Sequence, residues 1–287
     1  MSIVTETVPS QALLEAKNLV REFQVSKGGA FSGTETFRAV DQVSLALHAG
    51  RTTALVGESG SGKSTTARMI AKLLDVTSGS MHFEGEDVTR ASDATLRKFR
   101  ANVQVVFQDP FSSLNPKHTV DKIIAAPLDY QGIKGVDRRV LVKTLLERVG
   151  LNPDHSSRYP NQFSGGQAQR IGIARALAVE PKLVICDEAV SALDVSVQAQ
   201  VINLLRDLQQ ESGYSYLFIA HDLAVVRQIA DDVAVMSSGR IVEQGTTAQV
   251  FDNPAEAYTQ ALLSAVPVIN PEWEVRRQQS MGRIGAI

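Results

Sequence analysis

The chain has 287 residues, of which 44% are apolar and 21% charged. This composition argues against a disordered, collagen-like or disulfide-stapled protein. The 29 Lys and Arg residues nearly balance the 31 Asp and Glu residues, and the formal net charge of -2 disfavours nucleic acid as a partner, since general nucleic-acid binders carry a basic excess.

The single cysteine, Cys186, excludes an internal disulfide and any multi-cysteine metal site, which fits a reducing compartment. The segment Met1–Gln11 holds no Lys or Arg and no apolar run, so no signal peptide is predicted. No uninterrupted apolar stretch approaches the roughly 18 residues of a membrane-spanning helix. We therefore expect a cytosolic polypeptide that reaches a membrane only through partners.

The first half of the chain begins with strands and continues with helices. Alternating apolar residues predict strands at 13–25, 37–47, 53–56 and 103–107, with Gly28, Gly29 and Gly33 in the first loop. Helical spacing predicts helices at 63–74 and at 120–150, the second with an interruption at 127–135. We therefore expect a β-rich N-terminal sheet, then a strand-free helical region.

The second half alternates regularly between helix and strand. Helices are predicted from Gly166 to Val179 and at 195–210 and 223–229. Strands are predicted at 183–186, 216–220 and 233–236. This alternation indicates βα units and a mostly parallel sheet. The tail from Pro267 to Ile287 is expected to pack loosely.

The segment Gly57–Ser64 matches the pattern GxxxxGK[ST] between a predicted strand and a predicted helix. Its glycines let backbone N–H groups surround phosphate oxygens, Lys63 would neutralise the β- and γ-phosphates, and Ser64 would bind Mg²⁺. A flexible Gly/Ser turn is the alternative, which the strand–loop–helix context disfavours. The predicted nucleotide contacts here are Gly57, Glu58, Ser59, Gly60, Ser61, Gly62, Lys63, Ser64 and Thr65.

Polar residues follow three further predicted strands, at the edge of the sheet where catalytic groups gather. Asp187 is placed to hold Mg²⁺, and Glu188 to accept a proton from an attacking water. His221 is placed to contact a γ-phosphate, and Gln108 to orient water or bind Mg²⁺. Taken alone, the two acids could form a solvated turn, the histidine could be structural, and the glutamine could be an exposed turn residue.

The segment Ser164–Gln167 is a second glycine-rich helix start, and therefore a second candidate phosphate cradle. By itself it is explained equally well as a capped helix terminus. It becomes informative only beside the P-loop.

In order and spacing, these segments resemble the motifs of ABC-transporter ATP-binding subunits. The Walker A, Q-loop, signature, Walker B, D-loop and switch-histidine motifs correspond to Gly57–Ser64, Gln108, Ser164–Gln167, Val184–Glu188, Ser191–Asp194 and His221. The resemblance covers about residues 13 to 267. It implies an α/β fold with a P-loop NTPase (RecA-like) core, an antiparallel β subdomain and a helical signature subdomain at about 112–178.

The resemblance also assigns the site residues, with ATP and Mg²⁺ as cofactors. ATP would bind between two subunits, so that Lys63 of one faces the signature residues Ser164, Gly165, Gly166 and Gln167 of the other. It implies catalytic roles for Glu188, His221 and Gln108, magnesium binding by Ser64, Gln108 and Asp187, and a D-loop role for Asp194. Phe23 matches the aromatic residue that stacks on adenine, although an ordinary strand phenylalanine is the alternative.

Four segments, at 107–116, 158–167, 191–200 and 253–267, resemble the oligopeptide/dipeptide/nickel importer branch of the family. Departures from the usual residues occur at Phe163, Ala168, 189–190 and 256–257, and none removes a group that contacts phosphate, metal or water. We expect a disordered N-terminus at 1–12, an ATP-binding domain at 13–250 and a branch-specific C-terminal extension at 251–287.

The function implied is an ATP-hydrolysing subunit of a bacterial importer of peptides or related solutes. Its partners would be two transmembrane permease subunits, a second ATP-binding subunit (a paralogue or itself) and, indirectly, a solute-binding protein, with no nucleic acid; it would lie at the cytoplasmic face of the inner membrane. A soluble ABC ATPase of DNA repair or translation is the alternative, disfavoured because only about 100 residues, too few for a long coiled coil, separate Lys63 from Ser164. A P-loop kinase or GTPase would leave Ser164–Gln167 unexplained, whereas an exporter is disfavoured only by the branch resemblance.

Overall fold

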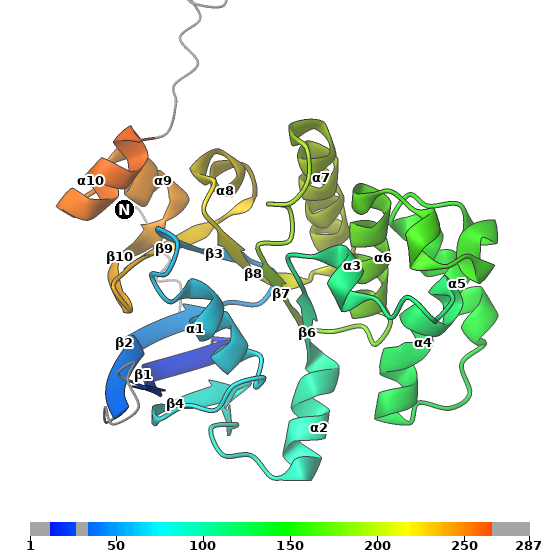
Figure 1. The fold of residues 1–287 in the computed structure, drawn as a ribbon, viewed down its shortest axis with the longest axis horizontal. Helices are drawn as coiled ribbons and strands as arrows, with labels where there is room; N and C mark the ends of the chain where they lie inside the picture. The colour runs from blue at the N-terminus through cyan, green and yellow to red at the C-terminus, as the bar shows by residue number, and fades with distance from the viewer. Residues whose placement is uncertain (1–11, 27–33, 266–287) are drawn as a thin grey trace, which may run out of the picture.

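The computed structural model describes residues 12–26 and 34–265 (Figure 1). It contains two sheets, and the smaller is antiparallel with strand order β2-β1-β4-β5. Its strands are β1 (Leu14–Ser26), β2 (Thr34–Leu47), β4 (Ser78–Phe83) and β5 (Glu86–Asp87). The predicted glycine loop at 28–33, residues 1–11 of the predicted disordered N-terminus and the tail from Pro267 lie outside the described residues.

The larger sheet has strand order β10-β9-β3-β8-β7-β6, in which only β10 is antiparallel to its neighbour. Its strands are β3 (Thr52–Val56), β6 (Val103–Val106), β7 (Leu183–Asp187), β8 (Ser215–Ala220), β9 (Asp232–Ser237) and β10 (Arg240–Thr246). Because β3, β8, β7 and β6 run in the same direction, their carboxyl ends meet at one edge, as the βα alternation predicts.

The helices cover this sheet and form a lobe beside it. They are α1 (Lys63–Ile70), α2 (Asp93–Asn102), α3 (Pro110–Ser113), α4 (Val120–Gln131), α5 (Arg138–Arg148), α6 (Gly165–Leu177), α7 (Val195–Ser212), α8 (Leu223–Ile229), α9 (Thr247–Asp252) and α10 (Ala257–Ser264). Short 3₁₀ turns lie at Pro153–Ser157 and Pro160–Gln162. Helices α3 to α6, which connect β6 to β7, lie together at one end of the molecule (Figure 1).

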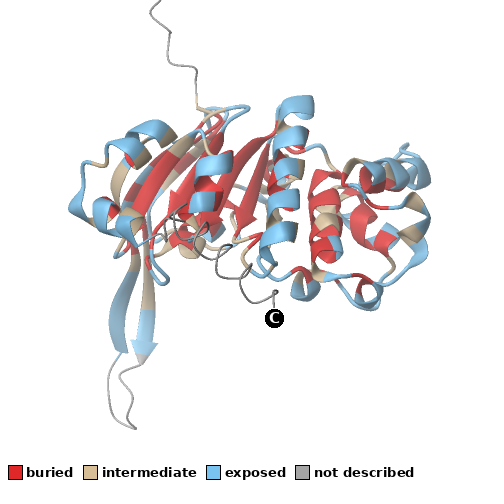
Figure 2. Cartoon of the chain, turned by 90° about the horizontal axis from the view of Figure 1, so that it is seen from above, coloured by how far each residue is buried: buried red, intermediate tan, exposed pale blue. Residues whose placement is uncertain are grey.

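The parallel strands are buried on both faces. In β8, Tyr216 and Phe218 pack into the core on the side of α7, whereas Leu217 and Ile219 pack into the core between the two sheets. Successive side chains of a strand point to opposite faces, so two apolar layers require a continuous apolar run, and this run is what the sequence shows. Figure 2 shows these strands as a buried central layer, with the exposed ends of β1 and β2 projecting from the body.

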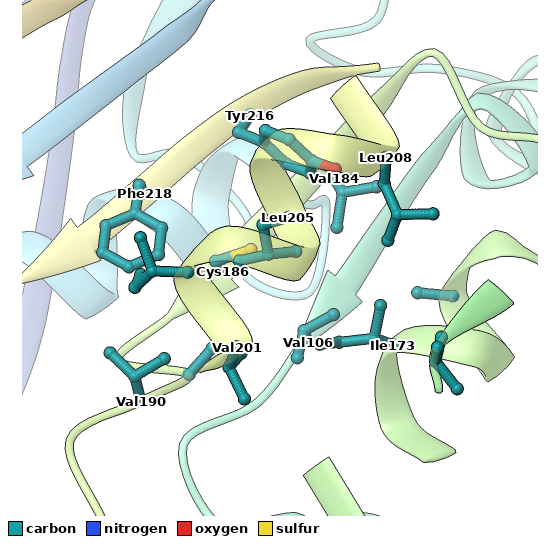
Figure 3. Packing of buried hydrophobic residues seen from close by; sticks show 14 of the residues in the cluster. Val106, Ile173, Val184, Cys186, Val190, Val201, Leu205, Leu208, Tyr216 and Phe218 are labelled. Carbon is teal, nitrogen blue, oxygen red and sulfur yellow. The ribbon is translucent and has the colours of Figure 1, made fainter. Parts of the chain in front are cut away.

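Helix α7 seals one face of the sheet beside the candidate site. Leu205 and Leu208 lie over Val184, Cys186 and Tyr216 (Figure 3). Burial raises the pKa of the Cys186 thiol to about 12, so the thiol stays protonated and packs as a small apolar group.

Two helix boundaries differ from the prediction. Helix α4 continues through Pro127 to Gln131, so the predicted interruption at 127 is wrong and the break begins at Gly132, whose φ is 69°. The proline costs one backbone hydrogen bond, which the burial of Ile124 and Leu128 on the same helix offsets. Helix α1 stops at Ile70, short of the predicted residue 74, because Lys72 adopts a φ of 55°.

Several short elements were not predicted, namely β4, β5, α2, α3, β10, α9 and α10. The strands among them are mostly exposed: β10 has no buried residue, and in β4 only Met81 and Phe83 are buried. A short half-exposed strand carries too few apolar residues to show a period, so pairing with β9 or β1 decides its conformation. In the part of the chain that the structure describes, every helix is too short or too polar to cross a membrane.

Candidate functional site

The P-loop connects β3 to α1 and is held tightly from outside. At Gly57, with a φ of 147°, a Cβ atom would lie 2.1 Å from the Met236 carbonyl oxygen, and at Gly62, with a φ of 104°, it would lie 2.6 Å from the Ala39 carbonyl oxygen. The Gly239 N–H donates a 3.0 Å hydrogen bond to the Ser61 carbonyl. The loop is therefore clamped between β2 and the β9–β10 turn, and only glycine fits at these two positions.

The Lys63 side chain lies buried beneath the loop. Its Nζ donates hydrogen bonds to the carbonyl oxygens of Gly57 at 2.8 Å and Glu58 at 2.7 Å. Burial lowers the pKa of Lys63 below its ordinary value, although the nearby carboxylates of Glu188, Asp187 and Glu58 raise it in part. A buried ammonium group bound only to neutral carbonyls is suited to receive an anion.

The two predicted magnesium ligands on either side of the loop are in contact. The Ser64 hydroxyl donates a 2.8 Å hydrogen bond to Oδ1 of Asp187, which is buried at the end of β7. The parallel register explains the contact, because it aligns Asp187 with Ile219 on β8 and aligns Val56, just before the P-loop, with Ala220.

Glu188 follows Asp187 in the left-handed region, with a φ of 50°. Its N–H donates to the Ile219 carbonyl at 3.1 Å, and its own carbonyl accepts a 2.9 Å hydrogen bond from the Ser191 hydroxyl. The Gln108 amide donates to the same hydroxyl at 3.2 Å. Ser191 therefore links Gln108 to Glu188, a role that the sequence did not predict, since this serine drew attention only as part of the D-loop segment.

His221 comes directly after Ala220, at the same edge of the sheet, and its side chain is exposed. The structure thus brings together the predicted residues of the P-loop, Asp187, Glu188, Gln108 and His221. One edge of the sheet therefore carries a phosphate-binding loop, two oxygen ligands suited to a hard cation, a carboxylate and an imidazole. These are the parts of a site for phosphoryl chemistry.

The signature segment lies elsewhere on the surface. Ser164 and Gln167 form a reciprocal cap at the start of α6, with the Ser164 N–H donating to Oε1 of Gln167 at 3.0 Å. A Cβ atom at Gly166 would lie 2.3 Å from Cγ1 of Val197, so the helix start leans on α7. Within the described residues, no hydrogen bond or ion pair joins 164–167 to the P-loop of the same chain.

The last two predicted site residues have local roles in this chain. Asp194 caps α7, and hydrogen bonds from the Val197 amide and the Ser196 hydroxyl lower the pKa of its carboxyl. Phe23 lies on β1, half-exposed, with the Arg21 guanidinium 4.8 Å from its ring centre.

Comparison with known proteins shows which family carries this combination of site residues. A family described as ABC transporter matches residues 40–191, a span that contains the P-loop, Gln108, the signature segment and Glu188. The chain belongs to the ABC transporter family. This chain, called the cassette from here on, also matches the C-terminal region of oligopeptide/dipeptide transporters at residues 242–284, which confirms the predicted branch.

Individual relatives support the same family and branch. The cassette is 48% identical, over 93% of its length and 87% of the relative, to the oligopeptide transport ATP-binding protein OppF of Bacillus subtilis. It is 49% identical, over 91% of its length and 74% of the relative, to the probable peptide ABC transporter ATP-binding protein y4tS of Sinorhizobium fredii. A solved dimeric, post-hydrolysis structure of the ATP-binding cassette MJ0796 with ADP and Pi matches 82% of the cassette and 98% of that chain, with 27% identity and a TM-score of 0.71.

These matches confirm two predictions. The fold is that of a P-loop NTPase with an added antiparallel sheet, and the cassette is an ATP-binding protein and an ATP hydrolase. The alternatives of a kinase or a GTPase are thereby set aside.

Proposed function

We propose that the cassette drives a bacterial importer that takes up dipeptides, oligopeptides or a related small solute. Support comes from the relatives named for oligopeptide and peptide transport and from the matching C-terminal region. A solute-binding protein would deliver the cargo to the permease and would act on the cassette only indirectly. Nothing favours the alternative of DNA repair or translation, since the charge is balanced and nucleic acid is not an expected partner.

The observation that carries the ATPase role is the grouping of Lys63, Ser64 and Asp187 at the P-loop. The residues present fit a nucleoside triphosphate with Mg²⁺. Lys63 offers a positive charge to the phosphates, and Ser61 Oγ is buried without a hydrogen-bond partner. The oxygen donors of the site suit a hard cation. Ser64, Gln108 and Asp187 would hold Mg²⁺, which when bound would neutralise negative charge on the phosphates.

Around these ligands, the other residues take separate roles in hydrolysis. Residues 57–65 would form the phosphate-binding loop, with the amides that are free in the described structure facing the phosphates, and Phe23 would stack on the adenine ring. Glu188 would take a proton from the attacking water, with its backbone held by Ile219 and Ser191. Gln108 would orient that water, and His221, exposed at the same edge, would contact the γ-phosphate.

The site is incomplete in one chain, so a second cassette, identical or paralogous, would complete it. Ser164 and Gln167 cap α6 and are exposed, and residues 164–167 form no hydrogen bond with the P-loop of their own chain, within the part that the structure describes. They would therefore face the ATP of the partner, with Asp194 and the D-loop at the same interface. Different contacts to ATP and ADP would close and open this dimer.

Two permease subunits would dock beside the Q-loop and hold the cassette at the cytoplasmic face of the inner membrane. A groove there, between the core and α4, is lined by apolar side chains such as Leu73 and Phe107 and by two guanidinium groups. Arg100 donates to the Tyr130 hydroxyl at 3.0 Å, and the half-buried Arg175 donates to the Ser113 carbonyl. Because the groove adjoins Gln108, rearrangement at the γ-phosphate would reach the membrane subunits. The domain division at residues 13–250 and 251–287 belongs to this proposal.

The test is recovery of tagged cassette from detergent-solubilised native membranes, with mass spectrometry of the partners and ATPase assays of the complex. We expect two multi-span proteins and a second ATP-binding subunit, with ATPase activity lost in Lys63→Ala and retained in Lys98→Ala, an exposed surface lysine paired with Glu86. A partner set of ribosomal or DNA-repair proteins would contradict the importer.

A further inference from the structure

The C-terminal helix α10 contacts the P-loop through one hydroxyl group. The Glu58 N–H donates a 3.2 Å hydrogen bond to Oη of Tyr258, a residue 200 positions later in the chain. The carbonyl of the same peptide group, that of Gly57, accepts the 2.8 Å hydrogen bond from Lys63 Nζ. Tyr258 and Lys63 therefore bind the two ends of one peptide unit.

The position of Tyr258 is itself fixed. Its ring packs against the main apolar core together with Leu262, one helical turn further along α10. At the start of α10, the Glu243 carboxylate on β10 accepts hydrogen bonds from the N–H groups of Ala255 at 2.8 Å and Glu256 at 3.2 Å. A carboxylate at a helix N-terminus is stabilising, so Glu243 anchors the helix that carries the tyrosine.

The strand that carries Glu243 is also linked to the P-loop through the larger sheet. Strand β10 pairs with β9, and the Met236 carbonyl of β9 lies against Gly57. The Gly57–Glu58 peptide is thus approached by β9 on one side and by α10 on another. Because glycine on one side of this peptide leaves its backbone free to rotate, the peptide needs outside contacts to keep one orientation.

We propose that Tyr258 is a positioning residue for the nucleotide site, which holds the Gly57–Glu58 peptide in one orientation and so preorganises the P-loop for ATP. This inference rests on the proposed role of the P-loop and Lys63. Without the hydroxyl, the P-loop of the nucleotide-free chain samples other orientations. Restoring the productive orientation then lowers the net binding free energy of ATP. The C-terminal segment then contributes to ATP affinity without touching the nucleotide.

Tyr258→Phe tests the proposal, because it removes the hydroxyl and keeps the packed ring. In calorimetric titrations of the full chain with ATP and Mg²⁺, we expect the Kd to rise about three- to tenfold, the effect of losing one hydrogen bond. The matched control is Tyr214→Phe, which alters a tyrosine just before β8, at the opposite edge of the sheet, and should leave the Kd unchanged.

A purely structural tyrosine would behave differently. In that case Tyr258→Phe would bind ATP as the wild type does, and only Tyr258→Ala, which removes the ring, would lower the unfolding temperature. An unchanged Kd in Tyr258→Phe, with ATP bound normally by the wild type, therefore overturns this inference alone. Failure of the wild-type chain to bind ATP would overturn the proposed function as well.

Glu243→Ala supplies a second variant that leaves Tyr258 in place. Since it releases the start of α10, we expect the Kd for ATP to rise in this variant too. Adding Tyr258→Phe should then raise the Kd no further, because both changes break the same connection. A double variant whose rise equals the product of the two single rises would contradict a route through Glu243.

Discussion

Ser64 on α1 and Asp187 at the end of β7 are joined by a hydrogen bond of 2.8 Å, although 123 positions separate them in the chain. An asparagine at 187 could still accept this hydrogen bond but would offer no charge to a cation. In Asp187→Asn we expect the apparent affinity for Mg²⁺ to fall at least about tenfold. Magnesium titration of the ATPase activity measures the change, with the exposed Asp207→Asn on α7 as control.

Chelation provides the matching test on the wild-type chain. If Ser64 and Asp187 hold Mg²⁺, excess EDTA abolishes hydrolysis and added Mg²⁺ restores it. Full activity in EDTA, or an unchanged magnesium titration in Asp187→Asn, would show that this pair holds no metal.

Removal of the Glu188 charge should separate binding from hydrolysis. Glutamine keeps the size and the backbone contacts to Ile219 and Ser191, but it cannot take a proton from water. In Glu188→Gln we expect ATP binding to persist, the dimer to stay closed and turnover to fall by about 10²- to 10⁴-fold. Size-exclusion chromatography with ATP and a phosphate-release assay measure both effects. The control is Glu211→Gln, an exposed position near the end of α7, and normal turnover in Glu188→Gln would refute the assigned role.

The link from Gln108 through Ser191 predicts coupling between two loops. Ser191→Ala removes the hydroxyl that bonds to Gln108 and to the Glu188 carbonyl, while the Ser191 N–H still donates to that carbonyl at 3.1 Å. We therefore expect ATP binding to be kept and hydrolysis to fall about three- to tenfold. In a Ser191→Ala background, Gln108→Ala should cost less than it does alone.

Independent, multiplicative losses in that double-mutant cycle would argue against the link. Ser157→Ala, at an exposed 3₁₀ turn, is the matched control and should leave both binding and hydrolysis at wild-type levels.

Asp41 binds the β9–β10 turn that contacts the P-loop, since its N–H donates to the Gly239 carbonyl. We expect its carboxylate to make an acid-sensitive contribution to the stability of the fold. Its carboxylate accepts hydrogen bonds from Arg240 at 2.6 Å and Arg38 at 3.0 Å, and the Arg240 bond is the main cause that lowers the pKa of Asp41 below its ordinary 3.8. A depressed pKa favours the folded state while the group is charged. The contribution is therefore complete above the unfolded value near 3.8 and is lost as the pH falls through the lower folded value.

Urea unfolding at neutral pH and at stepwise lower pH checks this prediction. Asp41→Asn should be less stable than the wild type at neutral pH, and the difference should shrink as the pH falls below about 4. A difference that stays constant over this range would show that the two arginines do not shift the titration of Asp41.

The candidate site was largely predictable because its parts are local in the sequence. A glycine-rich loop after a buried strand predicts a phosphate cradle, and polar residues after parallel strands must meet at one edge, as Ser64 and Asp187 do. The weaker predictions concerned short elements. Strand β10 and the course of α4 through Pro127 depend on contacts with distant segments, which a local pattern does not contain.

By itself, then, the sequence determined the P-loop, the apolar strands and the family, because these depend on residue types at short spacings. Only the tertiary structure decided that Ser191 connects Gln108 to Glu188, and that Tyr258 meets the amide of Glu58 from 200 positions away. Hydrogen bonds between distant segments require both partners to be fixed by packing. Their geometry therefore exists only in the folded chain.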